Sequence, residues 1–200
     1  MLWFKKMRFS SIILMVLLCF MVAFAAVHHA LHAKIIKKER ITSQITQHLK
    51  NENSTMEDSR AKRIASALYE ESNHYGLDYR LVLALMKIES NFQHDAVSSQ
   101  GARGLLQVKP SLAKFIAKDL GIKWDGHRTL DEPGMNIKIG ICFLSQLMGD
   151  FQNINLALKA YNMGPSKVKE FPQDNANSAK GFPGLVMNEY KKNVSVFPNP

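Results

Sequence analysis

Cysteine is scarce in this chain of 200 residues, which contains only Cys19, in an apolar stretch, and Cys142, in a predicted helix. A domain that follows the apolar stretch holds one cysteine and therefore cannot form an internal disulfide. No motif places an activating base beside Cys142, so a small core residue is the simplest interpretation. The stability of this domain must therefore come from the burial of apolar side chains, for which a chain with 46% hydrophobic residues is sufficient.

Acidic residues are almost absent from the first 50 positions, which hold eight Lys and Arg against one Glu. Residues 51–200 hold 18 Lys and Arg against 16 acidic residues, so the formal net charge of +9 belongs mostly to the N-terminal segment. The remainder lacks the concentrated positive charge of a nucleic-acid-binding domain, which excludes nucleic acid as a partner. The basic N-terminal segment is instead suited to membrane headgroups.

Strand-like alternation, internal repeats and low-complexity tracts are also missing, so we expect a mainly α domain. A Gly- and Ser-rich loop is expected at 95–109. Helices are predicted from about Ser59 to Asn73, after the N-cap Asp78, from Pro110 to about Leu120, from Pro133 to about Phe151, over Asn155–Tyr161, from Pro165 onward, and in a last helix through Tyr190.

Metal ligands form no complete set either. His28, His29 and His32 cluster in sequence, but no carboxylate or cysteine completes a ligand set beside them. We interpret them as a polar cluster next to the apolar segment. The sequence therefore predicts neither a metal nor a cofactor.

One long apolar run, Phe9 to Val27, carries no charge and follows the basic residues Lys5, Lys6 and Arg8. Its length favours an uncleaved membrane anchor. The small residues of Ala23-Phe24-Ala25 keep a cleaved signal sequence open as the alternative. The predicted organisation is an anchor or signal segment at 1–30, an amphipathic stalk and linker at 31–57, and a catalytic domain at 58–200.

Glu89 stands at the end of an otherwise apolar helical run. It lies four residues after Leu85 and seven after Val82, so it points toward the predicted buried face. Poor solvation there and the partial negative charge of the helix C-terminus both disfavour the charged carboxylate. A protonated carboxyl group near neutral pH is what a general acid needs. From this segment alone, the alternative is a helix-end glutamate that reaches solvent.

Four blocks occur in a fixed order after this helix begins. They are Glu89-Ser90-Asn91-Phe92, the segment 96–110 with Gly101, Gly104 and Gln107, Asn136-Ile137-Lys138-Ile139-Gly140, and Ala160-Tyr161-Asn162-Met163-Gly164-Pro165. Together they resemble the soluble-lytic-transglycosylase (SLT) family of lysozyme-like domains, over roughly Ser59 to Val194. The resemblance implies a mainly α, lysozyme-like domain with a deep cleft that binds peptidoglycan glycan strands.

The resemblance also implies a catalytic scheme with Glu89 as the single acid and base. Glu89 would protonate the glycosidic oxygen and then accept a proton from the C6 hydroxyl of the muramic sugar, giving a 1,6-anhydromuramic end. Substrate binding would fall to Ser98, Gln107, Tyr161 and Asn162, whose hydroxyl and amide groups suit sugar hydroxyls and N-acetyl groups. Taken singly, Ser98 and Gln107 could be loop or capping residues, and Tyr161 could pack in the core.

A second catalytic carboxylate, which most glycosidases employ, has no motif position here. The acidic residues nearest the blocks lie in a loop or at helix starts: Asp95, Asp125, Asp131 and Glu132. The chain departs from the family at Val186, where an acidic residue commonly stands about one turn before a tyrosine, here Tyr190. This departure bears on rate or substrate preference.

The sequence thus predicts a peptidoglycan lytic transglycosylase, anchored at the periplasmic face of the inner membrane or secreted to the periplasm after signal cleavage. A hydrolytic muramidase, in which water replaces the C6 hydroxyl, is one alternative. A peptidoglycan-binding scaffold without catalysis is another. Association with an envelope-spanning apparatus is a further hypothesis for which no residue gives direct evidence.

Overall fold

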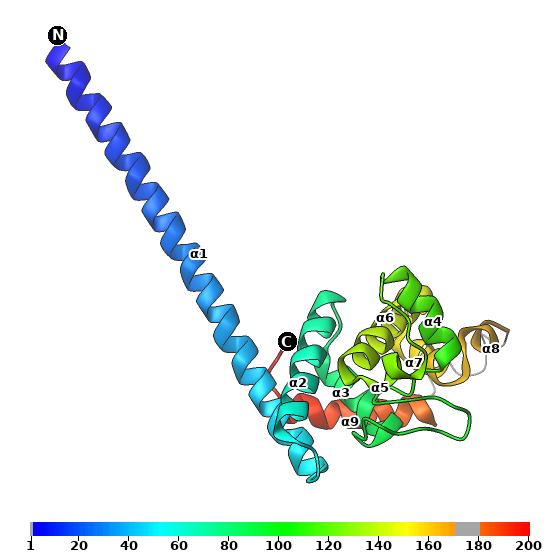
Figure 1. Cartoon of the computed structure of the whole chain (residues 1–200). Helices are drawn as coiled ribbons and strands as arrows, with labels where there is room; N and C mark the ends of the chain where they lie inside the picture. Colours follow the sequence, from blue (N-terminus) through cyan, green and yellow to red (C-terminus); the bar gives the residue numbers. More distant parts are fainter. Residues whose placement is uncertain (1, 171–180) are drawn as a thin grey trace. The chain divides into compact units, whose positions relative to one another are not determined.

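The computed structural model describes residues 2–170 and 181–200, and every helix or strand in that part of the chain is an α-helix. This confirms the mainly α prediction (Figure 1). The helices are α1 (Leu2–Glu52), α2 (Asp58–His74), α3 (Tyr79–Ser90), α4 (Pro110–Asp119), α5 (His127–Asp131), α6 (Pro133–Phe151), α7 (Ile154–Met163), α8 (Pro165–Glu170) and α9 (Phe182–Val196).

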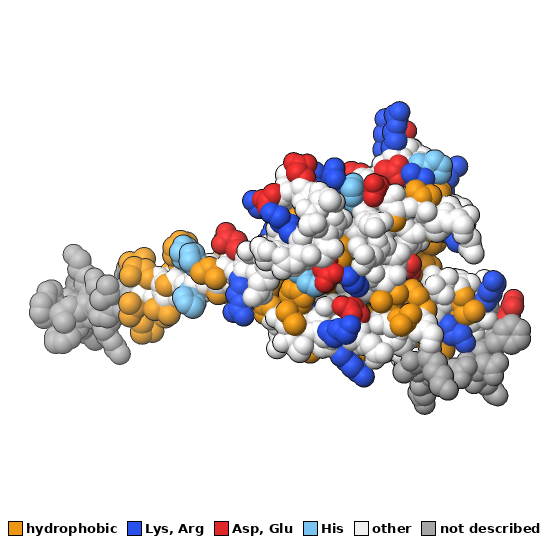
Figure 2. Space-filling model, turned by 90° about the horizontal axis from the view of Figure 1, so that it is seen from below, with side chains coloured by type: hydrophobic (Ala, Val, Ile, Leu, Met, Phe, Trp, Pro, Cys, Tyr) orange, Lys and Arg blue, Asp and Glu red, His pale blue; other side chains and the backbone are white. Residues whose placement is uncertain are grey.

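The chain forms two compact units, Met1–Arg40 and Ile41–Pro200. In the first unit α1 is uninterrupted, and Figure 2 shows hydrophobic side chains and histidines side by side along it. From Leu17 onward α1 is long and apolar enough to cross a membrane, a property that N-terminal signal sequences share. The side chains of residues 1–14 and 16, which include the start of the predicted apolar run, lie outside the described ones.

The second unit begins with the last part of α1, where Ile41, Ile45 and Leu49 are fully buried. Their spacing of four residues places them on one face of the helix. They belong to the segment 31–57, which is predicted from its sequence to be an amphipathic stalk and linker. The apolar stripe that suggested a stalk is the stripe that packs into the hydrophobic core of this unit.

Helix α3 lies at the centre of the second unit. All residues from Tyr79 to Met86 are buried, so the helix is covered on every side and not only on one face. It packs chiefly on α9 and α2, while α6 packs on α2, α7, α5 and α4. Glu89 lies at the end of α3, where the helix leaves this packed core. Because α3 packs on α9 and α2, it cannot shift without disturbing those helices.

Local signals explain most helix boundaries. The Asp78 side chain accepts the Arg80 N–H at 2.9 Å, which confirms the predicted N-cap of α3. The Glu132 side chain accepts the Gly134 and Met135 N–H groups at the start of α6, and Pro133 follows as the first helical residue. The short α5 was not predicted, and α9 passes through Tyr190, as predicted, and ends at Val196.

Candidate active site

Glu89 is the second-last residue of α3, and Val82 and Leu85, which share its face, are fully buried. Asn91 ends the helix in the left-handed conformation with φ 48°, and Phe92 follows at φ 61° with its side chain buried. No described residue donates a hydrogen bond to the Glu89 carboxylate. Burial raises its pKa to about 7, so near neutral pH this group can either donate or accept a proton.

The loop after α3 is held against α6 by Asn136, which is fully buried. Its Nδ2 donates to the carbonyls of Arg103 at 2.8 Å and Leu130 at 3.2 Å, and its Oδ1 accepts the Leu106 N–H at 2.9 Å. Gly104 has φ 75°, and a Cβ there would lie 2.3 Å from Asn136 Nδ2, so only glycine fits. Asn136 therefore supports the loop from behind and lies outside the cleft.

Gln107 has its side-chain amide turned back onto the loop. Its φ is 45°, and its Nε2 donates to the carbonyls of Ala96 at 3.1 Å and Gly104 at 2.9 Å. The Ser98 Oγ accepts the Ala102 N–H at 3.0 Å. Among the described residues, neither the Gln107 Oε1 nor the Ser98 hydroxyl hydrogen has a partner. Both side chains thus brace the loop and keep one polar atom available to a ligand.

Tyr161 joins α7 to the same loop. Its hydroxyl donates to the Leu106 carbonyl at 2.8 Å, and its ring packs against Phe143 with centroids 5.3 Å apart. Burial, and then the nearby Glu89 charge, raise the pKa of Tyr161 well above its usual range. The phenol is therefore neutral and lies close enough to Glu89 to sense its charge. Asn162 is the next residue, and its side chain is exposed.

All five residues predicted for the site line one cleft of about 650 Å³. The loop, the start of α4, α6 and the α7–α8 junction complete it with Ser99, Gln100, Ala102, Val108, Lys109, Ser111, Leu112, Phe143, Met163, Gly164, Pro165 and Lys167. The sequence blocks did not assign these residues to the site. Lys109 and Met163 lie inside the blocks, within two residues of the predicted site residues Gln107 and Asn162, which is a signal, whereas Phe143 and Lys167 lie outside the blocks and reach the cleft through tertiary packing.

Glu89 is the only carboxylate among the described residues that line this cleft. The four acidic residues considered from the sequence lie elsewhere: Asp95, Asp125, Asp131 and Glu132. Asp131 forms an ion pair with Arg103 at 2.7 Å, and Glu132 caps α6. The described lining of the cleft therefore offers one acid, together with hydroxyl, amide, ammonium and apolar groups.

Residues 2–170 and 181–200 contain no cluster of three or more His, Cys, Asp or Glu side chains that could hold a metal ion. His28 and His32 stack on α1 with ring centroids 6.4 Å apart. Cys142 is buried and accepts a hydrogen bond from Gln146 at 3.7 Å. These residues lie outside the cleft.

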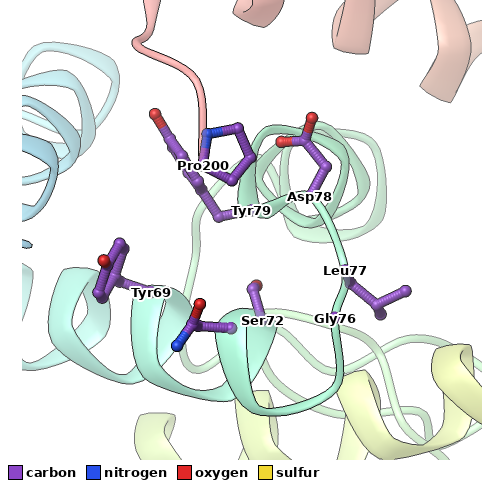
Figure 3. Close-up of a pocket in the computed structure, with 8 residues that line it drawn as sticks. Tyr69, Ser72, Gly76, Leu77, Asp78, Tyr79 and Pro200 are labelled. Atoms are coloured by element: carbon purple, nitrogen blue, oxygen red, sulfur yellow. The ribbon is translucent and has the colours of Figure 1, made fainter.

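A second pocket, of about 380 Å³, lies where α2 turns into α3 (Figure 3). The Ser72 side chain points into it between Tyr69 and Tyr79, and the Ser72 Oγ is buried without a hydrogen-bond partner. The pocket contains none of the predicted site residues. The acidic side chain in its described lining, Asp78, is already held by Arg80 and Tyr190.

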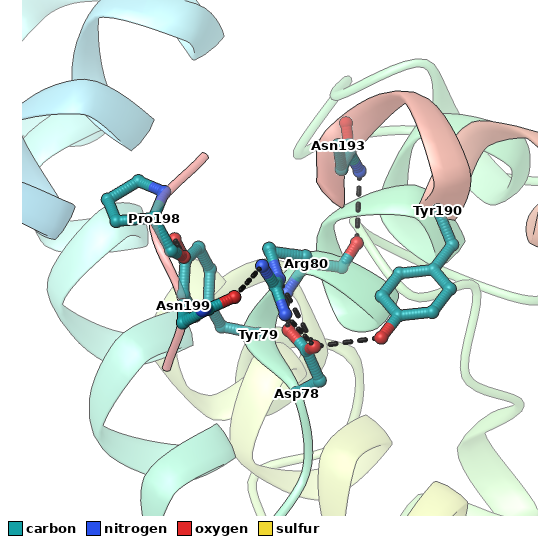
Figure 4. A network of polar contacts seen from close by, with 7 residues as sticks. All are labelled: Asp78, Tyr79, Arg80, Tyr190, Asn193, Pro198 and Asn199. Carbon is teal, nitrogen blue, oxygen red and sulfur yellow. Dashed lines mark hydrogen bonds and ion pairs between the residues drawn. The ribbon is translucent and has the colours of Figure 1, made fainter. Parts of the chain in front are cut away.

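A polar network next to this pocket fastens the C-terminal tail to the first turn of α3. Its members are Asp78, Tyr79, Arg80, Tyr190, Asn193, Pro198 and Asn199 (Figure 4). The Tyr190 hydroxyl donates to Asp78 Oδ2 at 2.8 Å, and Arg80 Nη1 donates to Asn199 Oδ1 at 2.8 Å. Burial would raise the pKa of Asp78, but hydrogen bonds from Arg80 and Tyr190 lower it below its usual value. Tyr190 thus serves the start of α3, and fully buried Val186 lies outside the cleft.

Comparison with known proteins agrees with this geometry. Residues 66–181 match the model of the transglycosylase SLT domain, which covers more than half of the chain. The chain therefore belongs to the SLT domain family, as the sequence blocks predicted.

Two curated relatives and one solved structure show the extent of the similarity. A membrane-bound lytic murein transglycosylase C of Edwardsiella ictaluri is 34% identical over 124 residues, which are 56% of this chain and 34% of that protein. A Haemophilus influenzae protein provisionally named a soluble lytic murein transglycosylase is 36% identical over 87 residues, which are 43% of this chain and 15% of that protein. The structure of an inactive Glu-to-Gln mutant of lytic transglycosylase Slt from Pseudomonas aeruginosa aligns with a TM-score of 0.52 at 32% identity, and covers 62% of this chain and 20% of that chain. The chain spans about a third or less of each of these proteins.

Proposed function

We propose that this protein is a peptidoglycan lytic transglycosylase that cleaves the β-1,4 bond between MurNAc and GlcNAc, with Glu89 as its single acid and base. The observation that carries the proposal is a half-buried carboxyl group with a pKa of about 7 in a cleft to which the described residues contribute no second carboxylate. Membership of the SLT family and the names of the relatives support it. The related Pseudomonas aeruginosa enzyme is inactive as a Glu-to-Gln mutant.

The proposed reaction needs one group that changes its protonation state twice. Glu89 donates its proton to the glycosidic oxygen as the bond from that oxygen to C1 of MurNAc breaks, and GlcNAc leaves with a 4-hydroxyl group. The Glu89 carboxylate then takes the proton of the MurNAc C6 hydroxyl, whose oxygen bonds to C1. The product is a 1,6-anhydromuramic end, no water is consumed, and Glu89 is protonated again. A pKa near the working pH suits both steps.

The other predicted site residues would hold the sugars around Glu89. The Gln107 Oε1 can accept from an N-acetyl N–H group, and the Ser98 hydroxyl can donate to a sugar oxygen. Asn162 adds an exposed amide at the cleft edge, and the Tyr161 oxygen keeps acceptor capacity while its hydrogen bonds to the Leu106 carbonyl. In this arrangement Glu89 transfers the protons, and the neighbouring side chains position the glycan strand.

Product analysis tests the proposal. Purified peptidoglycan sacculi are digested with wild type, Glu89→Gln and the control Asp95→Asn, which removes an exposed acid outside the cleft. We expect anhydro ends by mass spectrometry from wild type and the control, and at least a roughly 100-fold slower release from Glu89→Gln with an unchanged circular dichroism spectrum. Reducing ends would indicate a hydrolytic muramidase. Sacculus binding without any product would indicate a scaffold.

We infer that the catalytic unit works on the periplasmic side of the inner membrane, with α1 as its anchor. The long apolar helix and the membrane-bound relative support an anchor, and cleavage as a signal sequence is the alternative. Association with an envelope-spanning apparatus stays a hypothesis.

A further inference from the structure

Two lysines give the cleft a positive charge that the proposed chemistry does not use. Lys109 and Lys167 are the only cations, and Glu89 the only acid, among the described residues that line it. Lys109 is the residue before α4, and Lys167 lies in α8, 58 positions later in the sequence. Two separate segments therefore supply positive charge to one cleft.

Neither ammonium group is neutralised by a carboxylate in the described part of the chain. Lys109 Nζ lies 3.4 Å from the neutral Gln100 Oε1, and Lys167 has no partner among the described residues. The contrast within α8 is informative, because Lys169 forms an ion pair with Asp150 at 3.3 Å while Lys167 does not. Among the described residues, no carboxylate competes with an anionic ligand for the cleft lysines.

The substrate of the proposed function offers anions in only one place. The glycan backbone of peptidoglycan consists of neutral N-acetylated sugars, whereas the peptide stems attached to its muramic residues carry free carboxylates. We propose that Lys109 and Lys167 bind these stem carboxylates, so that the enzyme prefers strands with carboxylate stems to strands whose stems are amidated. This inference rests on the proposed function and specifies the substrate of the same cleft.

The size and the kinetic form of the effect follow from where the lysines lie. Both side chains are exposed, so each contact should change binding by about two- to fivefold. Salt should weaken the preference, because exposed charges are screened. Stem carboxylates take no part in bond breaking, so binding them equally in the ground state and the transition state alters KM and leaves kcat unchanged.

The test compares two preparations of the same sacculi, one untreated and one whose carboxylates have been converted to amides by carbodiimide and ammonia. KM and kcat for anhydro-end release are measured for wild type, Lys109→Gln, Lys167→Gln and the double variant. Lys169→Gln is the matched control, because it removes a paired lysine of the same helix that lies outside the cleft lining. We expect wild type and Lys169→Gln to show a KM roughly fivefold or more higher on amidated sacculi, with the difference reduced at high salt.

In the double variant the KM for untreated sacculi should rise to the value for amidated sacculi. A double variant that keeps the full preference would overturn the inference, as would a wild type that shows no preference. Binding is measured in parallel by cosedimentation of Glu89→Gln, with and without the two lysine substitutions, on both preparations. If no variant releases anhydro ends, the proposed function fails, and the binding preference still decides the inference about the lysines.

Discussion

The Tyr161 hydroxyl of α7 donates a 2.8 Å hydrogen bond to the backbone carbonyl of Leu106, which precedes it by 55 positions. The N–H of the same Leu106 donates to Asn136 of α6 at 2.9 Å. Leu106 therefore joins three of the four sequence blocks, and the pKa of Tyr161 responds to Glu89 of the remaining block. The four blocks, which are separate in the sequence, therefore meet at a junction beside the cleft.

Tyr161→Phe tests whether this junction matters for activity. The substitution keeps the ring against Phe143 and leaves the Leu106 carbonyl without its donor, which should cost about 1–2 kcal/mol of unfolding free energy. Activity should fall by about tenfold or more if the tyrosine oxygen also positions substrate near Glu89. Urea unfolding and anhydro-end release are measured beside Tyr69→Phe, which alters a tyrosine at the second pocket. A stability loss with wild-type turnover would leave Tyr161 a purely structural role.

Leu49→Ala tests whether the end of α1 is part of the catalytic unit. Leu49 is fully buried, and the neighbouring His48 ring meets the Phe92 ring edge-on with centroids 5.5 Å apart. We expect truncation to cost about 2–5 kcal/mol in urea unfolding of the full chain. Leu31→Ala is the matched control, because Leu31 is 57% exposed. Equal unfolding midpoints for both variants would favour a domain that starts near residue 58.

Glu89→Gln should make the folded protein more stable at high pH. The folded pKa of about 7 exceeds the ordinary value of 4.5, so the partial burial of this group costs nothing well below pH 4.5, where it is protonated in both states. As pH rises from about 4.5 through 7, wild type loses stability because the unfolded state ionises this group first, while glutamine does not titrate. The variant should therefore gain on the order of 1–3 kcal/mol over wild type at pH 8 and nothing at about pH 3. Urea titrations at both pH values decide, and an equal gain at both would exclude titration as its cause.

The helix boundaries could be predicted because capping residues mark them. Asp78, Pro110 and the Glu132-Pro133 pair stand where the sequence placed them, since capping is a local interaction. Periodicity identified one apolar face of α3, but α3 is buried all round, because that depends on α2 and α9 packing against it. The five-residue α5 is too short to show a helical period.

The residues of the candidate site also divide into those marked by a local sequence pattern and those placed by tertiary packing. Its five predicted residues lie in blocks that were identified through the family resemblance, and the structure brings all five to one cleft. Phe143 and Lys167 escaped because no short-range pattern links them to Glu89. Asn136 shows the converse, because its block is recognisable in sequence while its amide holds the loop from behind and does not face the cleft.

The N-terminal segment has two predicted fates that fractionation separates. An uncleaved anchor leaves the mature protein in the membrane fraction with its start at or near Met1, as the apolar length of α1 favours. A cleaved signal sequence gives a periplasmic protein that begins near Ala26. N-terminal sequencing of the fractionated protein distinguishes them, and a read near Ala26 in the soluble fraction would rule out the anchor.

Activity should decline as pH rises through about 7, because the protonated form of Glu89 that starts the reaction disappears. A cation in the cleft should stabilise the carboxylate, lower this pKa and move the declining limb to lower pH. Gln107 is unsuitable for such a probe, because its side chain is bonded to two loop carbonyls. Met163→Lys is cleaner, since Met163 lines the cleft and is 43% exposed.

Met135→Lys is the matched control for this probe, because Met135 is 38% exposed and lies outside the cleft lining. The measurement is kcat/KM against pH for the three proteins at low salt, with circular dichroism to verify folding and a repeat at high salt to screen the added charge. We expect the limb of Met163→Lys to move down and to return toward wild type at high salt, while Met135→Lys follows wild type throughout. A limb at the same pH in a folded, active Met163→Lys would mean that a cation at position 163 does not act on the group whose titration limits activity.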